Sequence, residues 1–94
     1  MMQELYSIKD VLVGFSQPFP MQNEAVALRA FVGSVQSSTP NVCNTNPEHK
    51  QLWRVGSFDD QTGKFISDLK LIADAGSYWR PTEVKPEVKD AASN

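Results

Sequence analysis

Alternating apolar and polar residues near the start of the chain predict two strands. In residues 5–10, Tyr6 and Ile8 fall on one face of an extended chain and polar residues alternate with them. A second alternating run covers residues 13–19, and the short connection between the runs favours an antiparallel hairpin. Because Pro18 cannot donate a ladder hydrogen bond, we expect the second strand to lie at a sheet edge or to end there.

The strongest local signal is an amphipathic helix over residues 24–36. Asn23 is a favourable N-cap residue, and Glu24 stands where the helix dipole stabilises a negative charge. On a helical projection, one arc of this segment gathers the apolar side chains Ala27, Leu28, Phe31, Val32 and Val35. Gly33 lies on the opposite side, where it either permits the close approach of a neighbouring backbone or is simply tolerated near the helix end.

The second half of the chain predicts another hairpin, which follows a polar loop over residues 37–48. Residues 51–58 alternate as a third strand, and residues 59–63 contain the Asp and Gly typical of a turn. Residues 64–66 begin the returning strand. A short fifth apolar stretch covers residues 69–73 and precedes a further turn.

The order strand–strand–helix–strand–strand predicts an α+β fold. We expect a small antiparallel sheet of four to five strands with one amphipathic helix packed on one face. Residues 1–79 are expected to form a single domain. Residues 80–94 show no apolar period, so they are expected to form a disordered, solvated tail unless a partner binds it.

Composition agrees with one small globular domain. The 94 residues are 40% apolar and 10% aromatic, which excludes a wholly disordered chain, a collagen repeat and a coiled coil. No apolar run reaches the ~18 residues of a membrane helix, and the first residues have no basic or apolar stretch, so we expect no secretory signal. A single cysteine excludes an intramolecular disulfide and fits a reducing cytoplasm.

The charge balance limits the classes of partner. Nine Lys and Arg against eleven Asp and Glu give a net charge of −2. Neutralisation of phosphates dominates affinity for nucleic acid, so this chain has no overall attraction to DNA or to anionic lipid. Binding to either would require a local basic patch.

Candidate catalytic and metal-binding groups are sparse. Asp59 and Asp60, with Asp68, could offer carboxylates to a divalent cation, but Asp at this position is typical of a turn. Cys43 and His49 are the one conceivable nucleophile pair, and no third group that would orient them is evident. We therefore expect no enzyme, no cofactor and no bound metal.

Aromatic and basic residues of the second hairpin offer a different chemistry. Single-stranded nucleic acid binds by stacking its bases on rings beside a basic groove. The predicted contacts are Arg54, Lys64 and Trp53, with Lys9 and Arg29 as secondary electrostatic helpers. The competing interpretation is that most of the rings build the core, because so small a domain needs its large side chains inside.

Several segments, taken in order, resemble a viral protein family. They are residues 5–10 (LYSIKD), 14–19 (GFSQPF), 23–31 (NEAVALRAF), 47–48 (PE) and 52–63 (LWRVGSFDDQTG). This ordered set resembles the small non-structural protein of gokushoviruses, which are tailless single-stranded DNA bacteriophages of the microvirus family. The resemblance spans roughly residues 5–73.

The resemblance implies a protein of the infected bacterium's cytoplasm that is absent from the virion. It implies either DNA binding or a role in the switch from duplex replication to single-stranded genome synthesis, and it carries over no catalytic residues. Two hypotheses follow. In the first, the protein binds single-stranded DNA during viral replication. In the second, it is a homodimeric interaction module that regulates the phage replication initiator or a host replication protein without touching DNA.

Overall fold

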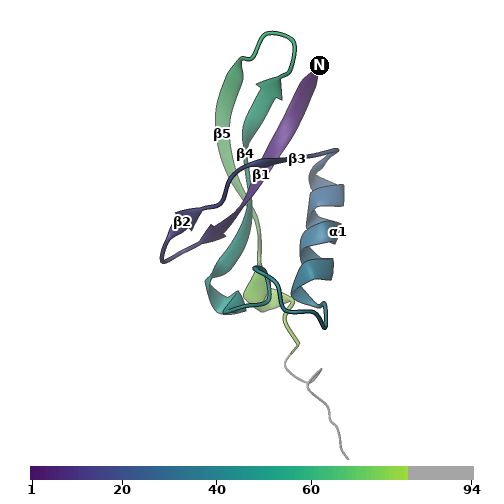
Figure 1. Cartoon of the computed structure of the whole chain (residues 1–94), viewed down its shortest axis with the longest axis vertical. Helices are drawn as coiled ribbons and strands as arrows, with labels where there is room; N and C mark the ends of the chain where they lie inside the picture. Colours follow the sequence, from purple (N-terminus) through teal and green to yellow (C-terminus); the bar gives the residue numbers. More distant parts are fainter. Residues whose placement is uncertain (81–94) are drawn as a thin grey trace, which may run out of the picture.

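A computed structural model describes residues 1–80 as one helix and a five-stranded antiparallel sheet (Figure 1). This architecture confirms the predicted α+β class. The expected tail over residues 80–94 lies outside the described residues, except for Arg80. In chain order the elements are β1 (Met2–Asp10), β2 (Gly14–Phe15), β3 (Phe19–Met21), α1 (Glu24–Val35), the short 3-10 helix η1 (Pro47–His49), β4 (Lys50–Asp59), β5 (Phe65–Asp74) and the 3-10 helix η2 (Ala75–Ser77).

The sheet is built around the long antiparallel pair of β1 and β4. The strand order is β2-β1-β4-β5, and β3 pairs with β1 beyond the end of β2. The β1–β4 ladder extends from Met2 opposite Asp59 to Asp10 opposite Lys50, with one irregularity beside Tyr6. β5 pairs with the other side of β4 and forms one edge of the sheet (Figure 1).

The predicted second strand, residues 13–19, is wrong as one continuous element. It is divided into β2 and β3, because Pro18 removes a backbone donor and the chain bulges over residues 16–18. The Ser16 side chain takes part in the ladder there, since its hydroxyl accepts a hydrogen bond from the Ile8 N–H at 3.0 Å. The same hydroxyl lies 3.0 Å from the buried Ser7 hydroxyl.

The predicted fourth and fifth strand segments are parts of one strand. Residues 65–66 and 69–73 fall in β5, and Lys64 lies just before it. β5 continues through Asp68 as one strand, although its register with β4 shifts there and again beside Ile72. The Asp68 side chain is 61% exposed and pairs with Arg54, so burial does not penalise its charge and it does not end the strand.

The helix prediction is confirmed within one residue. The Asn23 side chain accepts a hydrogen bond from the Val26 N–H at 2.9 Å, which caps the first turn. α1 lies along one face of the sheet (Figure 1) and buries three side chains of the predicted arc against Tyr6 and Leu52. Those three side chains are Ala27, Phe31 and Val35.

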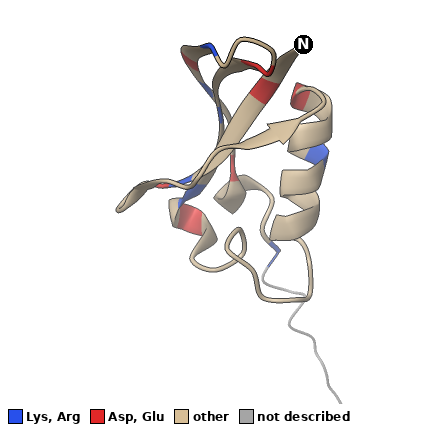
Figure 2. Ribbon diagram, turned by 45° about the horizontal axis from the view of Figure 1, so that its top comes forward, with Lys and Arg blue, Asp and Glu red and all other residues tan. Residues whose placement is uncertain are grey.

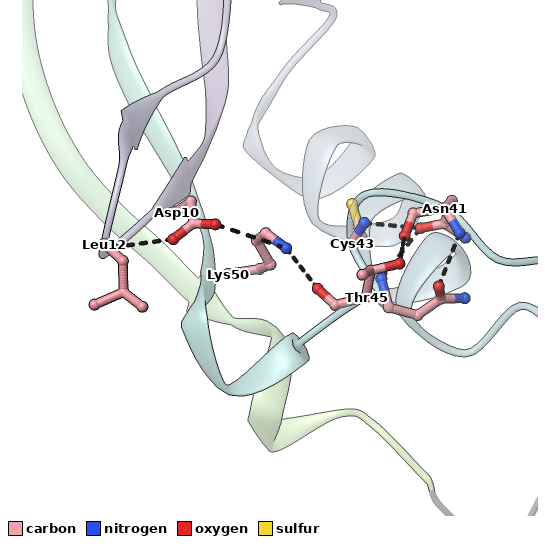
Figure 3. A network of polar contacts seen from close by, with 7 residues as sticks. Asp10, Leu12, Asn41, Cys43, Thr45 and Lys50 are labelled. Atoms are coloured by element: carbon pink, nitrogen blue, oxygen red, sulfur yellow. Dashed lines mark hydrogen bonds and ion pairs between the residues drawn. The ribbon is translucent and has the colours of Figure 1, made fainter.

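The polar loop after α1 is organised by side-chain hydrogen bonds (Figure 3). The Asn41 carboxamide oxygen accepts from the Cys43 N–H at 2.8 Å, and its nitrogen donates to the Ser34 carbonyl at 2.9 Å. The buried Lys50 ammonium donates to the Thr45 carbonyl and lies 3.9 Å from an Asp10 carboxylate oxygen. These contacts attach the loop to the end of α1 and to the start of β4.

Candidate nucleic-acid interface

The face of the sheet turned away from α1 carries a stripe of side chains that crosses four strands. Tyr6 and Leu52 point toward the helix, so their neighbours Ser7 and Trp53 point to the opposite side. The strand register then places a set of side chains on this side, which we call the open face: Phe15 on β2, Lys9 on β1, Gln51 and Trp53 on β4, and Leu71 and Asp74 on β5.

Lys9 lies between two aromatic rings on the open face. Its ammonium nitrogen is 5.1 Å from the ring centroid of Phe15 and 5.3 Å from that of Trp53. The two rings meet edge to face, with centroids 5.7 Å apart and an interplanar angle of 77°. Each cation–π contact at such an exposed site contributes about 0.5–1 kcal/mol. A positive charge and two rings are therefore held together on one surface.

Hydrogen bonds fix the orientation of the Trp53 indole. The indole Nε1–H donates to the Gln51 side-chain oxygen at 2.9 Å. The Gln51 amide nitrogen in turn donates to an Asp74 carboxylate oxygen at 2.9 Å. This chain of contacts orients the ring before any ligand arrives, which reduces the entropy lost on binding.

Arg54 does not join the open face. It follows Trp53 on β4 and lies opposite Tyr6, so its side chain projects to the helix side of the sheet. Its guanidinium donates to an Asp68 carboxylate oxygen at 2.6 Å. The predicted neighbours Trp53 and Arg54 are thus on opposite faces, because successive residues of a strand alternate.

Lys64 and Arg29 lie on other parts of the molecule. Lys64 is exposed at the turn between β4 and β5, and Arg29 is exposed on α1. Figure 2 shows basic and acidic segments interspersed over the sheet and the helix rather than gathered on one element. Of the five predicted contacts, the structure brings together Lys9 and Trp53.

Phe15 is a member of this cluster that the sequence analysis missed. The available signal was the register of the first hairpin, which pairs Lys9 with Phe15. A cross-strand pair shares one face of a sheet, so predicting that register would have placed the ring beside the lysine.

The other candidate groups are buried or engaged in local contacts. Cys43 is buried, and burial raises the pKa of its thiol, which opposes nucleophilic reactivity. Asp59 and Asp60 lie 3.6 and 2.8 Å from the N-terminal amine of Met1. A backbone hydrogen bond from Gln61 lowers the pKa of Asp59, as expected of a turn carboxylate.

Residues 1–80 contain neither a metal-binding cluster nor a membrane-spanning helix. No three His, Cys, Asp or Glu side chains gather closely enough to hold a metal ion. No helix is long and apolar enough to cross a membrane.

Comparison with known proteins identifies the family. A family model described as "Phage ORF5 protein" matches residues 3–78. Neither the curated proteins nor the solved structures include a significant match. The matched region extends from the second residue of β1 to the residue after η2, so it covers the helix, the open face and all of the sheet except Met2. The chain therefore belongs to the Phage ORF5 protein family, a family of bacteriophage proteins.

Proposed function

We propose that this phage protein acts in viral DNA replication by binding single-stranded DNA weakly on its open face. Membership in a phage family and the resemblance to gokushovirus non-structural proteins support a role in the cytoplasm of the infected bacterium, outside the virion. The observation that carries the proposal is the Lys9 ammonium held between the Phe15 and Trp53 rings. Phe15 is exposed and Trp53 is half-buried, and aromatic rings beside a cation are the features to which single-stranded nucleic acid binds.

The binding mode follows from the geometry of the cluster. A base that stacks on Trp53 takes the position of the Lys9 ammonium over the ring. The lysine stem is flexible, so the displaced ammonium can pair with the adjoining phosphate. Each stacked base contributes about 1–3 kcal/mol, and each neutralised phosphate on a single strand contributes about −0.7 to the salt slope. Asp74 at the border of the open face opposes phosphate, so we expect weak binding with a shallow salt dependence.

Fluorescence anisotropy with a labelled oligothymidine tests the proposal. At low salt, the full chain should bind with a micromolar dissociation constant. Lys9→Ala should weaken binding at least fivefold and lower the magnitude of the salt slope by about 0.7. The matched control is Arg29→Ala, which removes the same charge from the exposed side of α1 and should change the affinity less than twofold.

Intrinsic fluorescence gives a second readout at the ring itself. Trp53 and Trp79 are the two tryptophans of the chain. In a Trp79→Phe variant, oligothymidine should quench the remaining indole because a base stacks on it. The proposal fails if no binding occurs at tens of micromolar in low salt, or if Arg29→Ala weakens binding as much as Lys9→Ala.

A further inference from the structure

β5 is a long edge strand whose outer side is unpaired within residues 1–80. It contains ten residues, and the only described strand that pairs with it is β4. Natural sheets usually protect such an edge with short strands, prolines, charged side chains, bulges or a covering segment. β5 contains charged residues and has two register shifts against β4, but it is long and contains no proline. The other edge has these devices, since β2 and β3 are short and Pro20 lies in β3.

Apolar side chains are exposed along β5. Their exposed fractions lie between 44% and 57%, and they are Phe65, Ile66, Leu69 and Leu71. A strand with unpaired backbone groups and exposed apolar side chains is a template for pairing with another strand.

The charged residues in and beside β5 are arranged symmetrically about Leu69, with opposite signs. Asp68 and Lys70 flank Leu69, and Lys64 and Asp74 lie five residues away on either side. An antiparallel pair of two β5 strands centred on Leu69 therefore sets Asp68 opposite Lys70 of the second copy. The same register sets Lys64 opposite Asp74 of the second copy, so all four cross-strand charge pairs attract.

Neighbouring registers of the same pair are disfavoured by charge. Two residues that lie directly opposite each other across the two strands must point to the same face of the sheet. A two-fold axis normal to the sheet therefore passes between the two copies of one β5 residue, so alternative registers are centred on other single residues. A register centred on Asp68 places this aspartate opposite Asp68 of the second copy, and a register centred on Lys70 places two lysines opposite each other. Centring on Ser67 sets Lys64 against Lys70, and centring on Leu71 sets Asp68 against Asp74. Like charges directly opposite destabilise a strand pair.

The central charges are available for a second partner. Asp68 pairs with Arg54 at 2.6 Å and Lys70 with Glu24 at 2.8 Å, but the Asp68 and Lys70 side chains remain 61% and 54% exposed. A carboxylate has two acceptor oxygens and an ammonium has three N–H donors. Each group can therefore form a further ion pair across the strands while it keeps its present intramolecular partner. The centred register also pairs Leu69 with itself and Ile66 with Ile72, which adds apolar contact.

We propose that this protein is a homodimer in which β5 pairs antiparallel with β5 of a second copy, centred on Leu69. The two sheets join into one continuous sheet. A two-fold axis normal to that sheet leaves both open faces on the same side. Two Lys9–Trp53 surfaces then face the same way, although the dimer does not depend on DNA binding.

Charge reversal on β5 tests the dimer and its register together. Sedimentation velocity of the full chain should show a dimer at micromolar concentration. Asp68→Lys and Lys70→Asp should each weaken self-association at least tenfold, because each places like charges opposite one another twice. An equimolar mixture of the two variants should form a heterodimer, since both central positions then pair opposite charges again.

Controls separate the possible failures. Arg29→Asp reverses a charge on α1 and should leave the dimer intact, and circular dichroism should show that all variants are folded. Lys9→Ala should remain dimeric, so loss of DNA binding and loss of the dimer are distinguishable. A wild-type chain that stays monomeric at several hundred micromolar overturns the proposal, as does a dimer that neither β5 variant weakens or a mixture that forms no heterodimer.

Discussion

Gly56 lies on β4 beside the Ile66 carbonyl of β5, and replacing it with alanine should strongly destabilise the protein. A Cβ atom at this position would lie 2.2 Å from the Ile66 carbonyl oxygen and 2.7 Å from the Phe65 ring. The half-exposed Phe65 ring can rotate away. The Ile66 carbonyl belongs to the backbone, and it would have to retreat by about 1 Å to reach the ordinary contact distance of 3.4 Å.

The expected loss of stability follows from this displacement of the Ile66 carbonyl. Overpacking typically costs about 1–3 kcal/mol, and displacing the strand weakens one or two ladder hydrogen bonds worth about 0.5–1.5 kcal/mol each. We expect Gly56→Ala to lower the free energy of unfolding by about 3 kcal/mol. For a domain of this size, each kcal/mol shifts the melting temperature by about 4–8 °C, so the expected decrease is about 12–24 °C.

Gly33→Ala is the matched control because it adds the same methyl group to an open position. No atom lies within 4 Å of a Cβ built at Gly33. No neighbouring backbone therefore approaches this residue closely, and the glycine is simply tolerated near the helix end. Alanine should raise the stability by about 0.5–1 kcal/mol through helix propensity. Thermal and urea unfolding followed by circular dichroism measure both variants. The reasoning is refuted if Gly56→Ala lies within 1 kcal/mol of the wild type, or if Gly33→Ala is equally harmful.

Three other changes probe the cap, the core and the buried thiol. Asn23→Ala should destabilise the chain by about 1 kcal/mol in urea unfolding because it removes the helix cap, whereas Asn23→Asp should be nearly neutral; equal losses would contradict a capping role. Burial, followed by the hydrogen bond to Glu4, raises the pKa of Tyr6, so the folded phenol keeps its proton where the unfolded phenol loses it. Stability should therefore be retained below about pH 10 and fall above it, and the fall should be shallower in Tyr6→Phe. Cys43 should react with a disulfide reagent far more slowly in the native chain than in the urea-unfolded chain, and similar rates would show that the loop opens freely.

The sequence predicts α1 well because independent signals agree there. Asn23 caps the helix, one arc carries the apolar side chains, and the Ser-rich segment after Gln36 ends it. The divided second strand was partly visible, since Pro18 marks the interruption. What the sequence did not show is that the Ser16 hydroxyl would accept a ladder hydrogen bond and let β3 resume pairing with β1.

The candidate site was predicted less completely, because it depends on which face each side chain occupies. Trp53 and Arg54 are adjacent and look like one cluster along the chain, yet strand alternation separates them. Lys9 and Phe15 are six positions apart in sequence, and a hairpin register joins them. A stacking surface is made by cross-strand neighbours, so residue types within one strand are insufficient to define it.

One pattern accounts both for the strand that the sequence divided and for the dimer register. Ser67 and Asp68 interrupt the apolar residues of β5, which made one strand look like two fragments, and Lys70 adds a second charge two residues later. A buried central strand would not accept these charges, because an unpaired charge there carries a large desolvation cost. At an edge they do not break the strand, and their opposite signs on either side of Leu69 favour a single antiparallel alignment with a second copy. Asp68 therefore weakens the local strand signal and, in the proposed dimer, specifies the register together with Lys70.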